Sequence, residues 1–278
     1  MNNDFPKEWH LFSREMHTIQ WFIFSALNDL NKMSIHDKGA FYGFFTSLSL
    51  ALERYMKILL ILGFMVKNNL ALPDGKYIRS KGHDLEHLLK ECNEVASDHG
   101  IKISLIFDED SVKSIIVKFL SEYSKGGLRY YYIDSLSNIS KADDPMVTWR
   151  EILFDIYNKY VKLKRKNKKD IESFKVKSVL SEMGEDFVLL THGLDTNQLS
   201  LDAAFLEQSV IAESTLIVKS NVIEIIKNLK GISDFLEREC IVLHQKAGNK
   251  SPIIPYINEF LSIFENDTQY LTKKKKWL

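Results

Sequence analysis

One stretch, residues 41–68, limits what this chain can fold into more than any other. It reads FYGFFTSLSLALERYMKILLILGFMVKN and is apolar on nearly every side. A surface helix carries one apolar stripe, whereas a helix that is apolar all round belongs in the interior of a bundle. Glu53, Arg54 and Lys57 interrupt its middle with charge. The sequence therefore predicts a central helix that carries either an exposed charged strip or a small polar site.

The composition favours long helices. The chain has 278 residues but only 12 glycines and 5 prolines, so residues that break helices are sparse. Lys plus Arg and Asp plus Glu both number 37, so any binding to nucleic acid must come from a local patch. Cys92 and Cys240 lie far apart in helical patterns. They are expected to be reduced core thiols, and we predict neither a metal nor another cofactor.

The sequence also bears on location. The opening MNNDFPKEWH lacks the basic and then apolar layout of a signal peptide. The most apolar run, residues 58–66, has charged residues close by on both sides, unlike a membrane span. We therefore expect a cytoplasmic protein with no membrane partner.

Further helices are predicted on both sides of the central one. Apolar residues recur at helical spacing over residues 8–33, 112–124 and 145–163. Asp84 is a plausible N-cap for a helix that ends at Gly100.

In the second half, the pattern predicts a long helix from Ser200 to a terminator at Gly231. A separate helix capped by Ser233 would follow it. The tail, with its four lysines at 273–276 before Trp277, is expected to be a frayed, solvated end.

Three short motifs follow one another in the first half. Glu53 and Lys57, four residues apart, lie in ALERYMKILL. GHDL, which contains His83 and Asp84, opens the next helix, and Arg129 with its neighbour Tyr130 follows a later one. In this order the motifs resemble those of HEPN domains, over about residues 15–160.

The resemblance implies an all-α protein, with a HEPN-like helical bundle at 8–162 and a C-terminal helical region at 171–270. HEPN domains are often homodimers and are common in prokaryotic toxin–antitoxin and phage-defence systems. Catalytic members carry an Arg followed a few residues later by a His, but the residues after Arg129 are YYYIDSLSNIS. The resemblance therefore implies the non-nuclease branch, which binds a nucleotide, RNA or a partner protein rather than acting as an enzyme. The implied ligand-binding residues are Glu53, Lys57, His83, Asp84, Arg129 and Tyr130.

An alternative is a metal-independent ribonuclease of the HEPN type. Arg238 and His244 have five residues between them, which is the spacing of that signature. Arg could hold a phosphate through its fork of donors, and His could transfer protons near neutral pH. The pair lies outside the region that resembles the family, and on a straight helix the two side chains point about 120° apart.

A basic run at 162–169 separates the two halves. Six of its eight residues are Lys or Arg, and Lys164, Arg165 and Lys166 are candidates for contacting phosphates. The other interpretation is a solvated linker, because runs of charged residues are often exposed to solvent without binding a partner. A third possibility for the whole chain is a purely structural helical partner of another protein.

Overall fold

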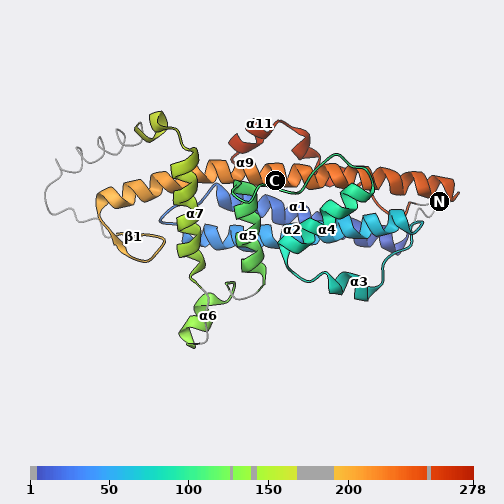
Figure 1. Cartoon of the computed structure of the whole chain (residues 1–278), viewed down its shortest axis with the longest axis horizontal. Coiled ribbons are helices and arrows are strands. Elements are labelled where there is room, and N and C mark those ends of the chain that lie inside the picture. The colour runs from blue at the N-terminus through green and yellow to red at the C-terminus, as the bar shows by residue number, and fades with distance from the viewer. Residues whose placement is uncertain (1–4, 126–127, 139–142, 168–190, 249–251) are drawn as a thin grey trace.

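Three long helices form the body of the molecule and run along its length (Figure 1). They are α1 (Lys7–Leu30), α2 (Lys38–Lys67) and α9 (Leu201–Lys246). The computed structural model describes residues 5–125, 128–138, 143–167, 191–248 and 252–278. Within these ranges the only sheet is a hairpin of two short strands, so the fold is all-α as predicted.

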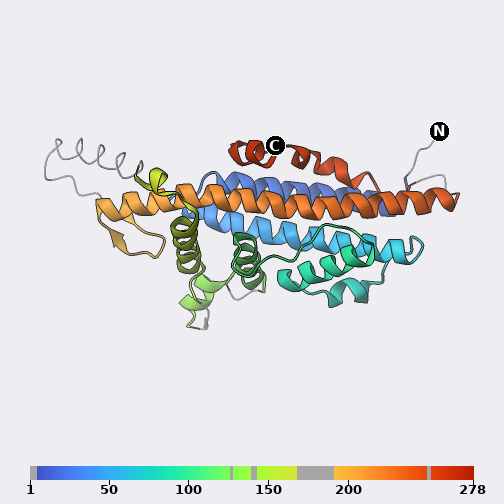
Figure 2. The same cartoon turned by 45° about the horizontal axis from the view of Figure 1, so that its top comes forward.

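The shorter elements lie on two sides of these helices (Figure 2). One side carries α3 (Gly75–Ser80), α4 (Leu85–Asp98), α5 (Val112–Ser124), α6 (Tyr131–Leu136) and α7 (Pro145–Tyr160). The other side carries the C-terminal segment, with α10 (Ile257–Phe260), a 3-10 turn (Ser262–Glu265) and α11 (Thr268–Lys273). The hairpin, β1 (Thr191–His192) and β2 (Gln198–Leu199), precedes α9.

Helix α2 is the buried centre that its sequence predicts. Asp37 caps its start by accepting a hydrogen bond from the Ala40 N–H at 3.1 Å. Three successive residues, 58–60, are all buried, so most of the helix circumference is covered there, and the remaining side, at Lys57 and Ile61, is half-buried. Its neighbours are α1, α4, α5 and α9. In the described part of the chain, no helix is both long enough and apolar enough to cross a membrane.

Helix α9 is longer than predicted, because neither Gly231 nor Ser233 interrupts it. A side chain at Gly231 would collide with Ile103, so this glycine provides close packing and does not end the helix. Ser233 caps nothing: its hydroxyl donates to the Lys230 carbonyl at 2.8 Å and lies 2.8 Å from the Tyr55 hydroxyl. The predicted break was wrong because long-range packing decides the role of both residues.

The two predicted regions share one buried cluster. The contact between Tyr55 and Ser233 joins α2 to α9 across 178 residues of sequence. The predicted boundary at 162–170 follows α7, and residues 171–190 of the predicted C-terminal region lie outside the described residues.

The chain end is packed, contrary to the prediction of a frayed tail. Trp277 is only 4% exposed and stacks on Phe264 with ring centroids 5.6 Å apart. Asn28 of α1 accepts from the Trp277 N–H at 2.9 Å and donates to its carbonyl at 3.0 Å. The prediction was wrong because the apolar ring of Trp277 packs on residues far away in the sequence, and burying an apolar ring is favourable.

Candidate functional site

A polar cavity of about 550 Å³ lies beside the middle of α2. It brings together four of the six residues that the resemblance implied: Glu53, Lys57, His83 and Arg129. They come from α2, from the residue before the N-cap of α4 and from the segment after α5. The rest of the lining is Glu15, Leu50, Arg54, Ile58, Ile61, Ile78 and Ser124.

Glu53 holds two of these side chains in place. Its Oε1 accepts from Lys57 Nζ at 2.8 Å and lies 2.9 Å from His83 Nδ1. The Glu53 and Lys57 side chains are only 12% and 18% exposed, so solvent screens this ion pair weakly. An acid four residues before a base is the favourable order on a helix. The pair is therefore a preorganised element of the cavity wall, and its two opposite charges largely neutralise each other.

Arg54 is paired in a similar way. Its Nη1 donates to both carboxylate oxygens of Glu15, at 2.7 and 2.9 Å. The sequence singled out Arg54 as a charge within an apolar helix but did not identify Glu15. These two residues lie 39 positions apart on different helices, so no local pattern could pair them.

Arg129 differs from the other two cationic side chains in the lining. Its Nε is buried and has no hydrogen-bond partner in the described residues, where it also makes no ion pair. Its guanidinium lies 5.9 Å from the ring centroid of Tyr123, whose hydroxyl is 3.1 Å from Thr46 Oγ1. A buried donor without an acceptor costs roughly 1–3 kcal/mol, and more when it is charged. Arg129 is therefore the group in this cavity that an anion would satisfy.

The other two residues implied by the resemblance, Asp84 and Tyr130, do not line the cavity. Asp84 caps α4 as predicted, through the N–H groups of Glu86 and His87. It also accepts from Ser121 Oγ at 2.8 Å and pairs with Lys125 Nζ at 2.7 Å, which ties α4 to α5.

The pKa of Asp84 reflects these contacts. Burial alone would raise it, but the hydrogen bonds from Lys125, Ser121 and the His87 N–H outweigh burial and lower the pKa to about 2. This carboxylate therefore holds two helices together, while Tyr130 is 55% exposed on the surface.

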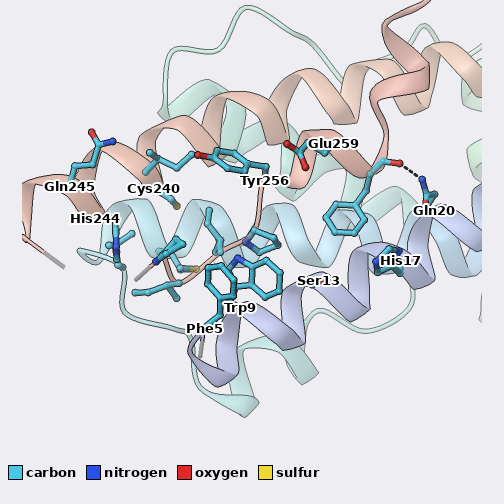
Figure 3. Close-up of a pocket in the computed structure, with 18 residues that line it drawn as sticks. Phe5, Trp9, Ser13, His17, Gln20, Cys240, His244, Gln245, Tyr256 and Glu259 are labelled. Carbon is cyan, nitrogen blue, oxygen red and sulfur yellow. Dashed lines mark hydrogen bonds between the residues drawn. The ribbon is translucent and has the colours of Figure 1, made fainter. Parts of the chain in front are cut away.

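The structure does not bring Arg238 and His244 together. Both lie on the uninterrupted α9, where their spacing turns the side chains about 120° apart. Arg238 is exposed and its Nε donates to the Asp234 carbonyl at 3.0 Å. His244 lines a different, largely apolar pocket (Figure 3), and Arg238 is not among the residues that line it.

The basic run is partly engaged within the molecule. Arg165 forms an ion pair with the buried Glu213. The Lys166 ammonium lies 4.7 Å from the ring centroid of Tyr157. Lys164 is exposed. Of the three candidates for phosphate contact, Arg165 is thus already neutralised by a carboxylate.

The described residues contain no group of three or more His, Cys, Asp or Glu side chains that could hold a metal ion. Comparison with family models, with curated proteins and with solved structures finds no match for this chain.

Proposed function

We propose that this chain is a non-catalytic, HEPN-like binding module that holds a phosphate group of a nucleotide or of RNA in the cavity beside α2. One observation carries the proposal: the buried Nε of Arg129 has no acceptor in the described residues, whereas Arg54 and Lys57 each have a carboxylate. The guanidinium has five donors in a planar fork that matches phosphate geometry.

The surroundings of Arg129 suit an anion of this size. A cavity of about 550 Å³ falls within the range of roughly 300–1,000 Å³ that is usual for small-molecule sites. Lys57 offsets the negative charge of Glu53, which would otherwise repel a phosphate, and His83 contacts the same carboxylate oxygen. Leu50, Ile58 and Ile61 also line the cavity and offer apolar surface to a base or sugar.

A binding measurement with a matched arginine variant tests the role of Arg129. Fluorescence anisotropy would follow labelled ATP, and in parallel a labelled single-stranded RNA, with wild type and with Arg129→Gln. We expect binding to weaken by about 10- to 100-fold, since hydrogen bonds to a charged group contribute roughly 1.5–3 kcal/mol. Arg238→Gln is the control, because Arg238 is exposed, lies outside the cavity and donates to the Asp234 carbonyl of its own helix. Equal affinity of Arg129→Gln and wild type would remove Arg129 from the site.

A second variant tests the support given by Lys57. In Lys57→Ala the carboxylate of Glu53 loses its main counter-charge, so we expect it to repel the phosphate and to abolish measurable binding. Lys67→Ala is the control on the same helix, because Lys67 pairs with Asp98 on α4, away from the cavity. If wild type binds neither ATP nor RNA, the anion-binding proposal fails and the partner-protein alternative takes its place.

The homodimer and the setting in a prokaryotic defence or toxin–antitoxin system are part of the same proposal and are supported by the resemblance. We do not propose the ribonuclease, because Arg238 and His244 face different surroundings on one straight helix.

A further inference from the structure

A second cavity, of about 760 Å³, lies at one end of the long helices (Figure 3). Its walls come from the start of α1, from residues 65 and 70 around the end of α2, from the last turns of α9 and from residues 252–260. Figure 3 shows Phe5 and Trp9 on the α1 side, with Cys240 and His244 on the α9 side. No residue is shared with the polar cavity beside α2.

The inner surface of this cavity is apolar. Met65, Leu70 and Ile254 are buried side chains of the lining. Cys240 is also buried, and burial raises the pKa of its thiol to about 12, so the thiol is neutral at physiological pH and acts as an apolar surface. Trp9 stacks on Phe5 with ring centroids 4.3 Å apart, which gives the cavity a flat aromatic wall.

His244 provides a hydrogen-bonding group within these apolar walls. Both ring nitrogens are shielded from solvent, and neither has a hydrogen-bond partner in the described residues. A neutral imidazole carries one N–H donor and one lone-pair acceptor, and leaving such groups buried without partners costs roughly 1–3 kcal/mol each. A hydroxyl group can serve either nitrogen, because it donates as well as accepts.

Charge decides which kind of molecule this cavity suits. No Lys or Arg is among the described residues that line it, and the one carboxylate, Glu259, is exposed. A phosphate or carboxylate in the interior would therefore find no Lys or Arg to pair with, and burying such a charge unpaired is costly. The cavity differs in this respect from the one that holds Arg129.

We infer that this cavity is a binding site for a neutral, mainly apolar small molecule that has a flat ring system and one hydroxyl group hydrogen-bonded to His244. The aromatic wall packs against the ring system, and the shielded imidazole recognises the hydroxyl. Binding here is separate from phosphate binding at Arg129, so either site can exist without the other.

Three matched probes test this inference: 1-naphthol, naphthalene, which lacks the hydroxyl, and 1-naphthoate, which carries a negative charge. Their affinities for the full chain would be measured by calorimetry or by quenching of Trp fluorescence. We expect 1-naphthol to bind about three- to tenfold more tightly than naphthalene, the ratio that one net hydrogen bond gives. We expect 1-naphthoate to bind more weakly than 1-naphthol, because no Lys or Arg lines the cavity.

Two variants locate the binding. His244→Phe keeps a flat ring but removes both nitrogens, so it should bind the two neutral probes equally. Ser13→Trp places a large ring in the cavity and should lose both. Arg129→Gln is the control and should bind as wild type does. Circular dichroism confirms that each variant keeps its helices.

The inference is overturned if wild type binds no 1-naphthol, or if Ser13→Trp binds it as wild type does, since the probe would then lie elsewhere. A preference for 1-naphthol that survives in His244→Phe would remove the role of His244. Tighter binding of 1-naphthoate than of 1-naphthol would contradict a site for neutral molecules.

Discussion

At the scale of single residues, buried polar groups in this protein divide into those that find partners and those that do not. Glu53 and Asp84 are fully engaged by neighbouring donors. Arg129 and His244 each keep buried nitrogens without a partner in the described residues. Native proteins satisfy nearly all buried polar atoms, so each exception needs an explanation. Glu91 Oε2, His99 Nε2, Trp149 Nε1, Asp234 Oδ1 and Trp277 Nε1 also lack a partner there, but only Arg129 and His244 line the two cavities described above. The two proposed sites rest on this contrast.

The ammonium of Lys219 has hydrogen-bond partners, but burying it lowers the stability of the fold by an amount that depends on pH. This side chain is 1% exposed and donates to Asn31 Oδ1 at 2.8 Å and to the Lys274 carbonyl at 2.5 Å. Burial lowers the pKa of its ammonium from 10.5 to about 8. Between these two values the unfolded chain holds a proton that the folded chain has released, so stability increases as pH rises through this window.

We therefore predict that wild type gains stability relative to Lys219→Met between pH 8 and pH 10.5. The gain should not exceed about 3.5 kcal/mol, at about 1.4 kcal/mol for each unit of pKa shift. Urea unfolding of both proteins at several pH values measures it, and the difference cancels the titration of other groups. A difference that stays constant with pH would show that Lys219 has an ordinary pKa.

At the scale of elements, the sequence predicts those helix starts that depend on a few neighbouring residues. The N-caps Asp84 and Ser200 were predicted correctly, because a cap is recognised from a few adjacent residues. The break at Gly231 was wrong, because the side chain that packs closely against this glycine, Ile103, is distant in the chain. Local signals thus predicted the caps at Asp84 and Ser200 but failed at Ser233, whose hydroxyl packs against Tyr55 of a distant helix.

Close packing between α2 and α4 gives a prediction for another glycine. A Cβ added to Gly63 would lie 2.5 Å from Val95 Cγ1 and 3.3 Å from its Cγ2, and a β-branched side chain has little freedom to move away. We expect Gly63→Ala to destabilise the fold by about 1–2 kcal/mol, because overpacking outweighs the gain in helix propensity.

The matched control for that prediction is Gly39→Ala, on the same helix. There the nearest atom to an added Cβ is Asp37 Oδ1 at an ordinary 3.5 Å. We expect this variant to be neutral or to gain up to about 1 kcal/mol. Thermal unfolding of both compares them directly, and equal stability of the two variants would show that α4 yields to the added methyl group.

At the scale of the whole molecule, the candidate site could be predicted only in part. Glu53 and Lys57 were found because they are four residues apart on one helix. The pairing of Arg54 with Glu15, which completes the cavity, joins two helices and has no local signal. The same holds for the packed chain end, where Trp277 meets Asn28 across 249 residues.

The chain end gives a prediction for the whole molecule. Trp277 is almost fully buried between Phe24, Phe264 and the side chain of Lys219. We expect Trp277→Ala to cost about 3–5 kcal/mol in unfolding free energy, as truncation of a buried aromatic ring does. Denaturant unfolding measures this loss. Leu278→Ala is the control, because that side chain is 99% exposed, and a similar loss in both variants would contradict a specific role for the ring.

The contact between Tyr55 and Ser233 has a consequence for how the protein is made. When α2 leaves the ribosome, the helix that covers one side of it has yet to be translated, since 178 residues separate the two side chains. At about 5–20 residues per second, this delay lasts on the order of 10–35 seconds. During that time the apolar surface of α2 that α9 later covers stays exposed. We therefore expect chaperones to bind the nascent chain until α9 has been translated.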